Sequence, residues 1–245
     1  MGTPPTRAES IPWRCQIILV LLCLLLPFLG SCSSTPDPVS PAKPLTVQQP
    51  PKAHLTYIAI GASDTYGIGA DDPPTENWPA DLAQKLGSGA RLVNLGIPGI
   101  RLHHALDIEL PVAIDAKPDL VTVWLAVNDL ANNVAVSDYS HDLDLLLSRL
   151  QAAVPHARIV VANVPDLILL PYFSSFDQQA LATQAQDYNT AIATLVKRHH
   201  VIAVDLYQQW TELSNHPEYI SSDGLHPSTL GYTRLAELFY QVLQY

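Results

Sequence analysis

Cysteine is scarce in this chain of 245 residues and confined to one end. The three cysteines are Cys15, Cys23 and Cys32, and none follows. The region after Cys32 can therefore form no disulfide, no thiolate metal site and no cysteine nucleophile. Positive charge is also scarce: 13 lysines and arginines stand against 23 aspartates and glutamates, which gives a formal net charge of −10. Such a balance repels nucleic acid, so we expect no nucleic-acid partner.

A long apolar run is absent except near the start, where residues 17–28 are almost wholly apolar. This run is about a dozen residues long, whereas a membrane-spanning helix needs about 20. Arg7 and Arg14 precede it, and a positive segment followed by a short apolar one is typical of a secretory signal peptide. An N-terminal membrane anchor that is never cleaved is the alternative.

The apolar run leads into Leu29, Gly30, Ser31 and Cys32. This sequence resembles the bacterial lipobox, in which a leucine and two small residues precede a cysteine. The resemblance implies a lipoprotein signal peptide over residues 1–31, cleavage before Cys32 and lipid attached to Cys32. Several acyl chains on one residue anchor more firmly than one, so we expect an extracytoplasmic protein held to the membrane of the cell envelope by its lipid alone.

Proline is frequent in the segment after Cys32. Between residues 33 and 54 it occupies positions 36, 38, 41, 44, 50 and 51, among small polar residues. Such a segment cannot build a helix or a strand ladder and favours an extended polyproline conformation. We therefore expect residues 32–54 to be a lipidated cysteine and tether, and residues 55–245 to be one folded domain. A disordered leader with no spacing role fits residues 33–54 equally well.

From residue 55 onward short apolar stretches alternate with helical patterns. Strands are predicted at residues 55–60, 91–95, 120–126, 158–163 and 201–206. Helices are predicted at residues 77–86, 102–116, 138–154, 177–199 and 228–243, with Pro111 expected to bend or split the second. This alternation predicts a five-stranded parallel sheet covered by helices on both faces.

Residues with reactive or hydrogen-bonding groups follow successive strands. Ser63 follows the first, Gly99 the second and Asn128 the third, while Asp223 and His226 precede the last helix. The carboxyl ends of parallel strands meet at one edge of the sheet, so these residues can lie over one crevice although they are far apart in the sequence.

Together these residues meet the chemical needs of acyl transfer. Ser63 supplies a hydroxyl, His226 a base to take its proton and Asp223 a carboxylate to orient that base. The backbone N–H groups of Ser63 and Gly99 and the amide of Asn128 could stabilise the oxyanion that forms. We find no pattern that predicts a metal or cofactor site.

The four segments resemble the conserved blocks of the SGNH (GDSL-type) hydrolase superfamily over about residues 55–245. The resemblance implies a flavodoxin-like three-layer α/β/α fold and serine esterase or lipase activity on a small ester or acylated substrate, without a metal or cofactor. It implies that Ser63 is the nucleophile, that Ser63, Gly99 and Asn128 form the oxyanion hole, and that His226 and Asp223 complete the catalytic set.

Two positions depart from the superfamily pattern. Ala62 stands where an aspartate usually precedes the serine, with the acid moved to Asp64, and Ala126 replaces a usual glycine. These departures keep a second function open, in which a non-catalytic envelope lipoprotein uses the fold as a binding or scaffold module. An α/β-hydrolase is disfavoured, because it requires a glycine two residues after the serine and Thr65 is there instead.

Each candidate residue also has an ordinary structural interpretation. Ser63, Asn94 and Asn128 could cap helices, and His226 could be a surface residue beside a turn. Trp78 and Trp124 are expected in the core. The apolar segment at residues 167–176 could be a buried connector or, as our hypothesis, one wall of a pocket for the acyl group.

Overall fold

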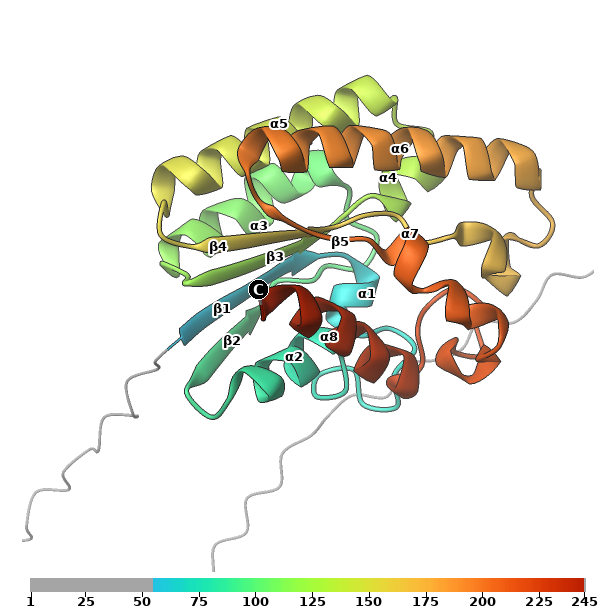
Figure 1. Ribbon diagram of the computed structural model, residues 1–245, viewed down its shortest axis with the longest axis horizontal. Coiled ribbons are helices and arrows are strands. Elements are labelled where there is room, and N and C mark those ends of the chain that lie inside the picture. The colour runs from blue at the N-terminus through green and yellow to red at the C-terminus, as the bar shows by residue number, and fades with distance from the viewer. Residues whose placement is uncertain (1–54, 245) are drawn as a thin grey trace, which may run out of the picture. The chain divides into compact units, whose positions relative to one another are not determined.

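The computed structural model describes residues 55–244, which build a parallel sheet between two layers of helices (Figure 1). The strands are β1 (Leu55–Gly61), β2 (Ala90–Asn94), β3 (Leu120–Trp124), β4 (Arg158–Ala162) and β5 (Ile202–Val204). Their order is β2-β1-β3-β4-β5, and every neighbouring pair is parallel. This is the flavodoxin-like order, so the predicted fold class is confirmed. The predictions for residues 1–54 lie outside the described residues.

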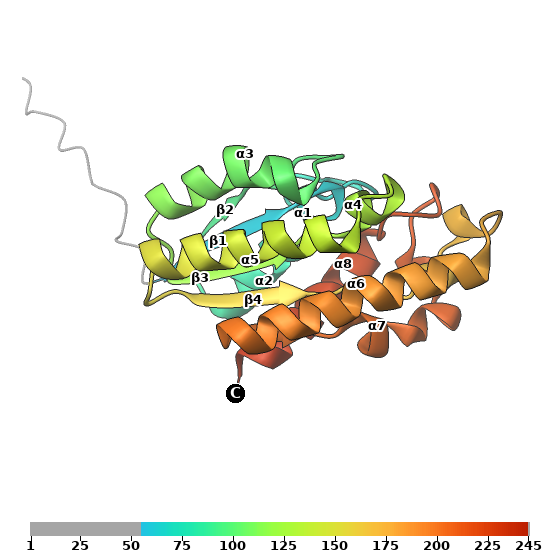
Figure 2. The ribbon, with the colours of Figure 1, turned by 90° about the horizontal axis from the view of Figure 1, so that it is seen from above.

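The helices divide between the two faces of the sheet. Helices α3 (Leu102–Asp115), α5 (Val136–Ala153) and α6 (Gln178–His199) lie side by side on one face, as Figure 2 shows from above. Helices α2 (Trp78–Leu86) and α8 (Thr229–Leu243) cover the other face (Figure 1). Shorter helices join these elements: α1 (Ser63–Tyr66), α4 (Val127–Ala131), α7 (Leu206–Gln209), and the 3-10 turns η1 (Leu167–Leu169), η2 (Pro171–Phe173), η3 (Thr211–Ser214) and η4 (Pro217–Tyr219).

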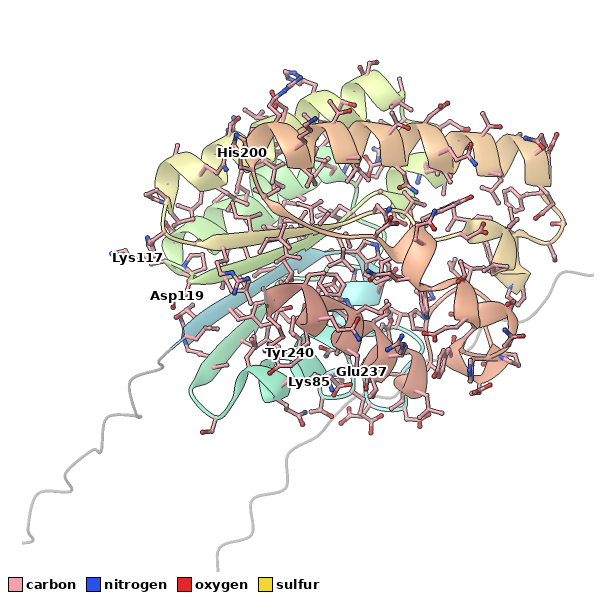
Figure 3. All side chains as sticks on the ribbon, viewed as in Figure 1. Lys85, Lys117, Asp119, His200, Glu237 and Tyr240 are labelled. Atoms are coloured by element: carbon pink, nitrogen blue, oxygen red, sulfur yellow. The ribbon has the colours of Figure 1, made fainter. Side chains whose placement is uncertain are left out.

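The core lies on both faces of the sheet, because the central strands are apolar on both sides. Trp78 of α2 stacks on Phe239 of α8 with ring centroids 4.1 Å apart, and Trp124 meets Trp78 edge-on. Both tryptophans are buried, as expected. At the rim of the same helix pair, Lys85 and Glu237 form an ion pair of 3.9 Å (Figure 3). Helices α8 and α2 are thus held together by an aromatic stack and an ion pair.

Element boundaries differ from the predictions where a polar residue begins a new helix. Strand β5 ends at Val204 because the side chain of Asp205 accepts the N–H of Gln208 and starts α7. Pro111 does not split α3, which runs unbroken; Pro111 and Asp107 are both exposed, so water can bind the carbonyl that proline leaves unpaired.

Different residues lie at the two ends of the sheet. Lys117, Asp119 and His200 lie just before β3 and β5, at the end of the sheet opposite to α1 (Figure 3). Helix α1 begins where β1 finishes, at the carboxyl ends of the strands (Figure 1). Among residues 55–244, no helix has both the length and the apolar composition that crossing a membrane requires.

Candidate active site

Ser63, His226 and Asp223 form a continuous chain of hydrogen bonds at the carboxyl end of the sheet. Ser63 Oγ lies 2.9 Å from Nε2 of His226, although the two residues are 163 positions apart. Nδ1 of His226 lies 2.6 Å from Oδ2 of Asp223. The ionised carboxylate of Asp223 can only accept a hydrogen bond, so Nδ1 carries the proton and Nε2 accepts from the hydroxyl of Ser63.

The loop that carries the histidine is held by its own backbone. Oδ1 of Asp223 accepts the N–H groups of Leu225 and His226 at 2.8 and 2.9 Å. Gly224 adopts φ +74°, a conformation that favours glycine, and this lets the loop turn between the acid and the imidazole. Burial raises the pKa of Asp223, but hydrogen bonds from His226 and the two N–H groups outweigh it and lower the pKa to about 2. Asp223 is therefore ionised at neutral pH.

The structure rules out helix capping for three side chains. Helix α1 is capped by Ala62 without a side-chain hydrogen bond, and the hydroxyl of Ser63 bonds to His226 instead. Asn128 lies inside α4 and donates its amide to the carbonyl of Ile100 at 2.9 Å. Asn94 donates to the carbonyl of Thr65 at 2.6 Å, which ties α1 to the loop after β2.

A pocket of about 30 Å³ lies beside the serine. Ser63, Asn128 and His226 all contribute to its wall, together with Ala62, Asp64, Ile100, Trp124, Leu125, Ala126, Val127 and Leu225. This volume is about the share of one water molecule in liquid water. Gly99 is not part of the wall, but it directly precedes Ile100 and has φ +78°.

Among residues 55–244, three N–H protons near this pocket have no hydrogen-bond acceptor. The N–H of Ser63 is free because Ser63 is the first residue of α1, and the first N–H groups of a helix have no acceptor within it. For the N–H of Gly99, the structure gives no acceptor among residues 55–244. The amide nitrogen of Asn128 carries two protons, and its bond to Ile100 uses one.

Asp129 is a site residue that the sequence predictions missed. Its buried carboxylate accepts the N–H of Leu102 at 3.0 Å, at the start of α3. Burial raises its pKa, and the N–H of Leu102 acts in the opposite direction. Asn128 and Asp129 together hold the loop that carries Gly99. The only signal in the sequence was the position of Asp129 beside Asn128.

The departures from the superfamily pattern have clear places in the site. Ala126 has φ −178°, outside the left-handed region that favours glycine. Asp64 is half-buried and shares the pocket wall with Ser63 and His226. Burial raises the pKa of Asp64 to about 6. Attraction by His226 lowers this pKa, and repulsion by Asp223 raises it further. A second carboxyl group thus stands beside the histidine.

The apolar segment at residues 167–176 combines the two predicted interpretations. Leu167, Leu170 and Phe173 are buried, which fits a connector. Ile168, Tyr172 and Phe176 are exposed, and the N–H of Tyr172 donates to the carbonyl of Gly224 at 3.0 Å. The exposed half of the segment therefore borders the loop that carries His226.

Metal ligation finds no support in the described part of the chain. Among residues 55–244, no group of three or more histidine, aspartate or glutamate side chains is arranged to hold a metal ion.

Three solved structures illustrate how common this architecture is. The lipase/acylhydrolase from Enterococcus faecalis is 19% identical, with a TM-score of 0.63 over 78% of this chain and 95% of its own. The acetyl xylan esterase AlAXEase is 16% identical, with a TM-score of 0.63 over 77% of this chain and 100% of its own. The family 3 carbohydrate esterase of Clostridium thermocellum is 20% identical, with a TM-score of 0.61 over 76% and 94%. At these identities the likeness shows the fold alone.

Sequence comparison identifies the family directly. A search of curated protein sequences finds no significant match. The model of the GDSL-like lipase/acylhydrolase family, however, matches residues 59–234, which include every residue of the candidate site. With this match and the five-stranded α/β/α fold, the chain belongs to the GDSL-like lipase/acylhydrolase family of hydrolases.

Proposed function

We propose that this protein is a serine esterase that works through an acyl-enzyme. The observation that carries the proposal is the hydrogen bond of 2.9 Å between Ser63 Oγ and Nε2 of His226, with Asp223 behind the imidazole. His226 takes the hydroxyl proton as Ser63 Oγ attacks the ester carbonyl. The protonated imidazole then gives that proton to the leaving alcohol. Water, activated by His226, releases the acid and restores Ser63.

The oxyanion in each step requires hydrogen-bond donors beside the pocket. We assign this role to the N–H groups of Ser63 and Gly99 and to the second amide proton of Asn128, which have no other acceptor within residues 55–244. Donors already fixed in place stabilise developing charge without reorganising, and this is commonly the largest single contribution to catalysis.

The pocket supports a short acyl group as the preferred substrate. A volume of about 30 Å³ is about the share of one water molecule in the liquid, so the pocket suits a methyl-sized group and a longer chain must extend out of it. Two of the structurally similar proteins are named as an acetyl xylan esterase and a carbohydrate esterase, so esters whose alcohol part is a sugar belong among the substrates to test. The exposed side chains of Ile168, Tyr172 and Phe176 would support any longer chain outside.

A fluorophosphonate probe tests the proposal directly, since it reacts with an activated serine. We expect the wild-type protein to be labelled and Ser63→Ala to remain unlabelled. In an ester series from p-nitrophenyl acetate to octanoate, with acetylated sugars alongside, we expect the fastest turnover with acetate. A wild-type protein that neither reacts with the probe nor hydrolyses any ester, yet binds an acylated ligand, would favour the non-catalytic binding module instead.

We also propose that the enzyme is anchored to the cell envelope by lipid on Cys32. Support comes from the sequence of residues 17–32, which lies outside the described structure. Cells fed an alkyne-bearing fatty acid should label the wild-type protein but not Cys32→Ser. The same substitution should move the protein from the membrane fraction to the soluble one, and a variant still labelled and membrane-bound contradicts the anchor.

A further inference from the structure

Glu109 is a buried carboxyl group that the steps above do not use. It lies on the inner face of α3 with 1% of its surface exposed, among Leu102, Ala105, Leu106, Leu110 and Ala113. Every neighbour on this face is apolar, so a carboxyl group here is costly unless it is neutral or bonded. Burial raises its pKa to about 8, against one backbone hydrogen bond, so the group is mainly protonated at neutral pH.

The single hydrogen bond of Glu109 reaches the strand that delivers the nucleophile. Its Oε1 accepts the N–H of Gly61 at 3.2 Å, and Gly61 is the last residue of β1, two positions before Ser63. The pairing of β1 with β2 ends at Ala59 and Asn94, so the side chain of Glu109 takes up a donor that lies beyond the ladder. Its other oxygen, Oε2, is buried and has no partner among residues 55–244.

Other contacts also hold the segment from Gly61 to Thr65: Gly61 pairs with Trp124 of β3, and the carbonyl of Thr65 accepts the amide of Asn94. The carbonyl of Gly61 accepts the N–H of Ile97 at 3.0 Å, which holds one side of the residue. The side chain of Thr65 fills the place where a Cβ on Gly61 would lie, yet its buried hydroxyl has no partner in the described part of the chain. Packing against Thr65 sets how closely α1 approaches Gly61. The bond to Glu109 holds the peptide N–H of Gly61 in one direction.

We propose that Glu109 is a positioning residue for Ser63. By accepting the N–H of Gly61, it fixes the end of β1 and, through Ala62, directs the hydroxyl of Ser63 toward His226. The inference rests on the proposed esterase function. It requires a neutral acceptor at this position rather than a negative charge, and this distinguishes the role from a general need for an acidic residue.

Two variants of the full-length protein separate these roles. Glu109→Gln keeps the acceptor oxygen and the shape, whereas Glu109→Leu fills the same apolar site without an acceptor. Asp107→Leu, which removes an exposed carboxylate from the same helix, is the matched control. The measurements are kcat and KM with p-nitrophenyl acetate, the rate of fluorophosphonate labelling and the melting temperature.

We expect Glu109→Gln and Asp107→Leu to keep kcat within about threefold of wild type, because neither removes the acceptor. Glu109→Leu should lower kcat and the labelling rate by about 10- to 100-fold with little change in KM, because misplacing a reacting group slows its reaction. Its melting temperature should fall only slightly, since leucine suits the apolar site but leaves the N–H of Gly61 without its acceptor.

Three results would overturn the inference. One is wild-type kcat in Glu109→Leu, and another is an equal loss of kcat in Glu109→Gln. The third is a loss in Glu109→Leu that matches its loss of folded protein, which would indicate a structural role only. If the wild-type protein is itself inert toward ester and probe, the esterase proposal fails and this inference fails with it.

Discussion

Asn128 and Ile100 join the loops after two different strands, because the amide of Asn128 donates to the carbonyl of Ile100 at 2.9 Å. The neighbouring Asp129 accepts the N–H of Leu102 at 3.0 Å in the same loop. These two bonds fix the segment that carries Gly99 relative to α4. Two of the proposed oxyanion donors, Asn128 and Gly99, therefore lie on segments that these hydrogen bonds join.

Removing the amide of Asn128 should slow the reaction strongly without unfolding the protein. We expect Asn128→Ala to lower kcat by about 10²- to 10³-fold with a smaller change in KM, as for the loss of one oxyanion donor. Steady-state kinetics with p-nitrophenyl acetate measures this, with the exposed Asn215→Ala as control. A kcat within a few-fold of wild type would show that Asn128 is not a donor to the oxyanion.

Asp223→Asn should disable the histidine while leaving the loop folded. The asparagine oxygen can still accept the N–H groups of Leu225 and His226, but it no longer fixes the proton on Nδ1. We expect kcat to fall by about 10³- to 10⁴-fold and circular dichroism to be unchanged. Near-normal turnover would mean that another group orients His226.

Asp64 should assist catalysis only when it is ionised. Its pKa is about 6, so above that pH its negative charge stabilises the imidazolium of His226 that forms in the reaction, and below it the effect is lost. We expect Asp64→Asn to lower kcat/KM roughly three- to tenfold at about pH 8 and hardly at all at about pH 5, a difference of about 1 kcal/mol. A ratio of variant to wild type that is constant with pH would contradict this.

The exposed aromatic side chains of residues 167–176 should matter for long acyl chains only. Tyr172 and Phe176 are 53% and 51% exposed, whereas Phe173 is 2% exposed and its truncation would damage the core. We therefore expect Tyr172→Ala and Phe176→Ala to lower kcat/KM for octanoate about tenfold and to leave acetate unchanged, because each removes apolar contact area. An unaltered preference for ester chain length would rule out the pocket-wall hypothesis.

Burial of Glu109 should make the stability of the protein depend on pH. The pKa of Glu109 is raised from its ordinary 4.5 to about 8, so the folded state binds a proton that the unfolded state releases between these values. Stability should therefore fall as pH rises through this window, by up to about 1.4 kcal/mol per pH unit from this group.

Glu109→Gln has no carboxyl group to titrate at this position. The free energy of unfolding of the variant, relative to that of wild type, should therefore rise with pH. Urea unfolding of both proteins at about pH 5 and about pH 7.5 measures the difference, because the midpoint and slope give the free energy of unfolding. Parallel stability curves for the two proteins would show that the carboxyl group is not neutralised by folding.

The long elements of the fold could be predicted because each has a clear apolar pattern. All five strands and the helices at residues 77–86, 138–154 and 228–243 agree with β1–β5, α2, α5 and α8 to within a few residues. The short helices α1, α4 and α7 were missed, since helices of four or five residues have no apolar period to detect.

The residues of the site also differ in how far the sequence predicts them. Ser63, Asn128, Asp223 and His226 stand at strand or helix ends, where topology alone places them together. Glu109 lies in the middle of a helix, and its partner Gly61 is far away in the sequence. A carboxyl group on an otherwise apolar stripe was the one signal present, but the residue it contacts depends on how α3 lies across β1.

Ser63 lies near the start of the domain and His226 lies near its end. Helix α8, just after His226, packs on α2 through Phe239 and Trp78, and the imidazole reaches back to Ser63. A chain that ends before residue 226 lacks the imidazole, however much of its sheet has formed. If the proposed esterase function holds, turnover requires the chain through His226, and we expect any truncation before residue 226 to be inert toward esters.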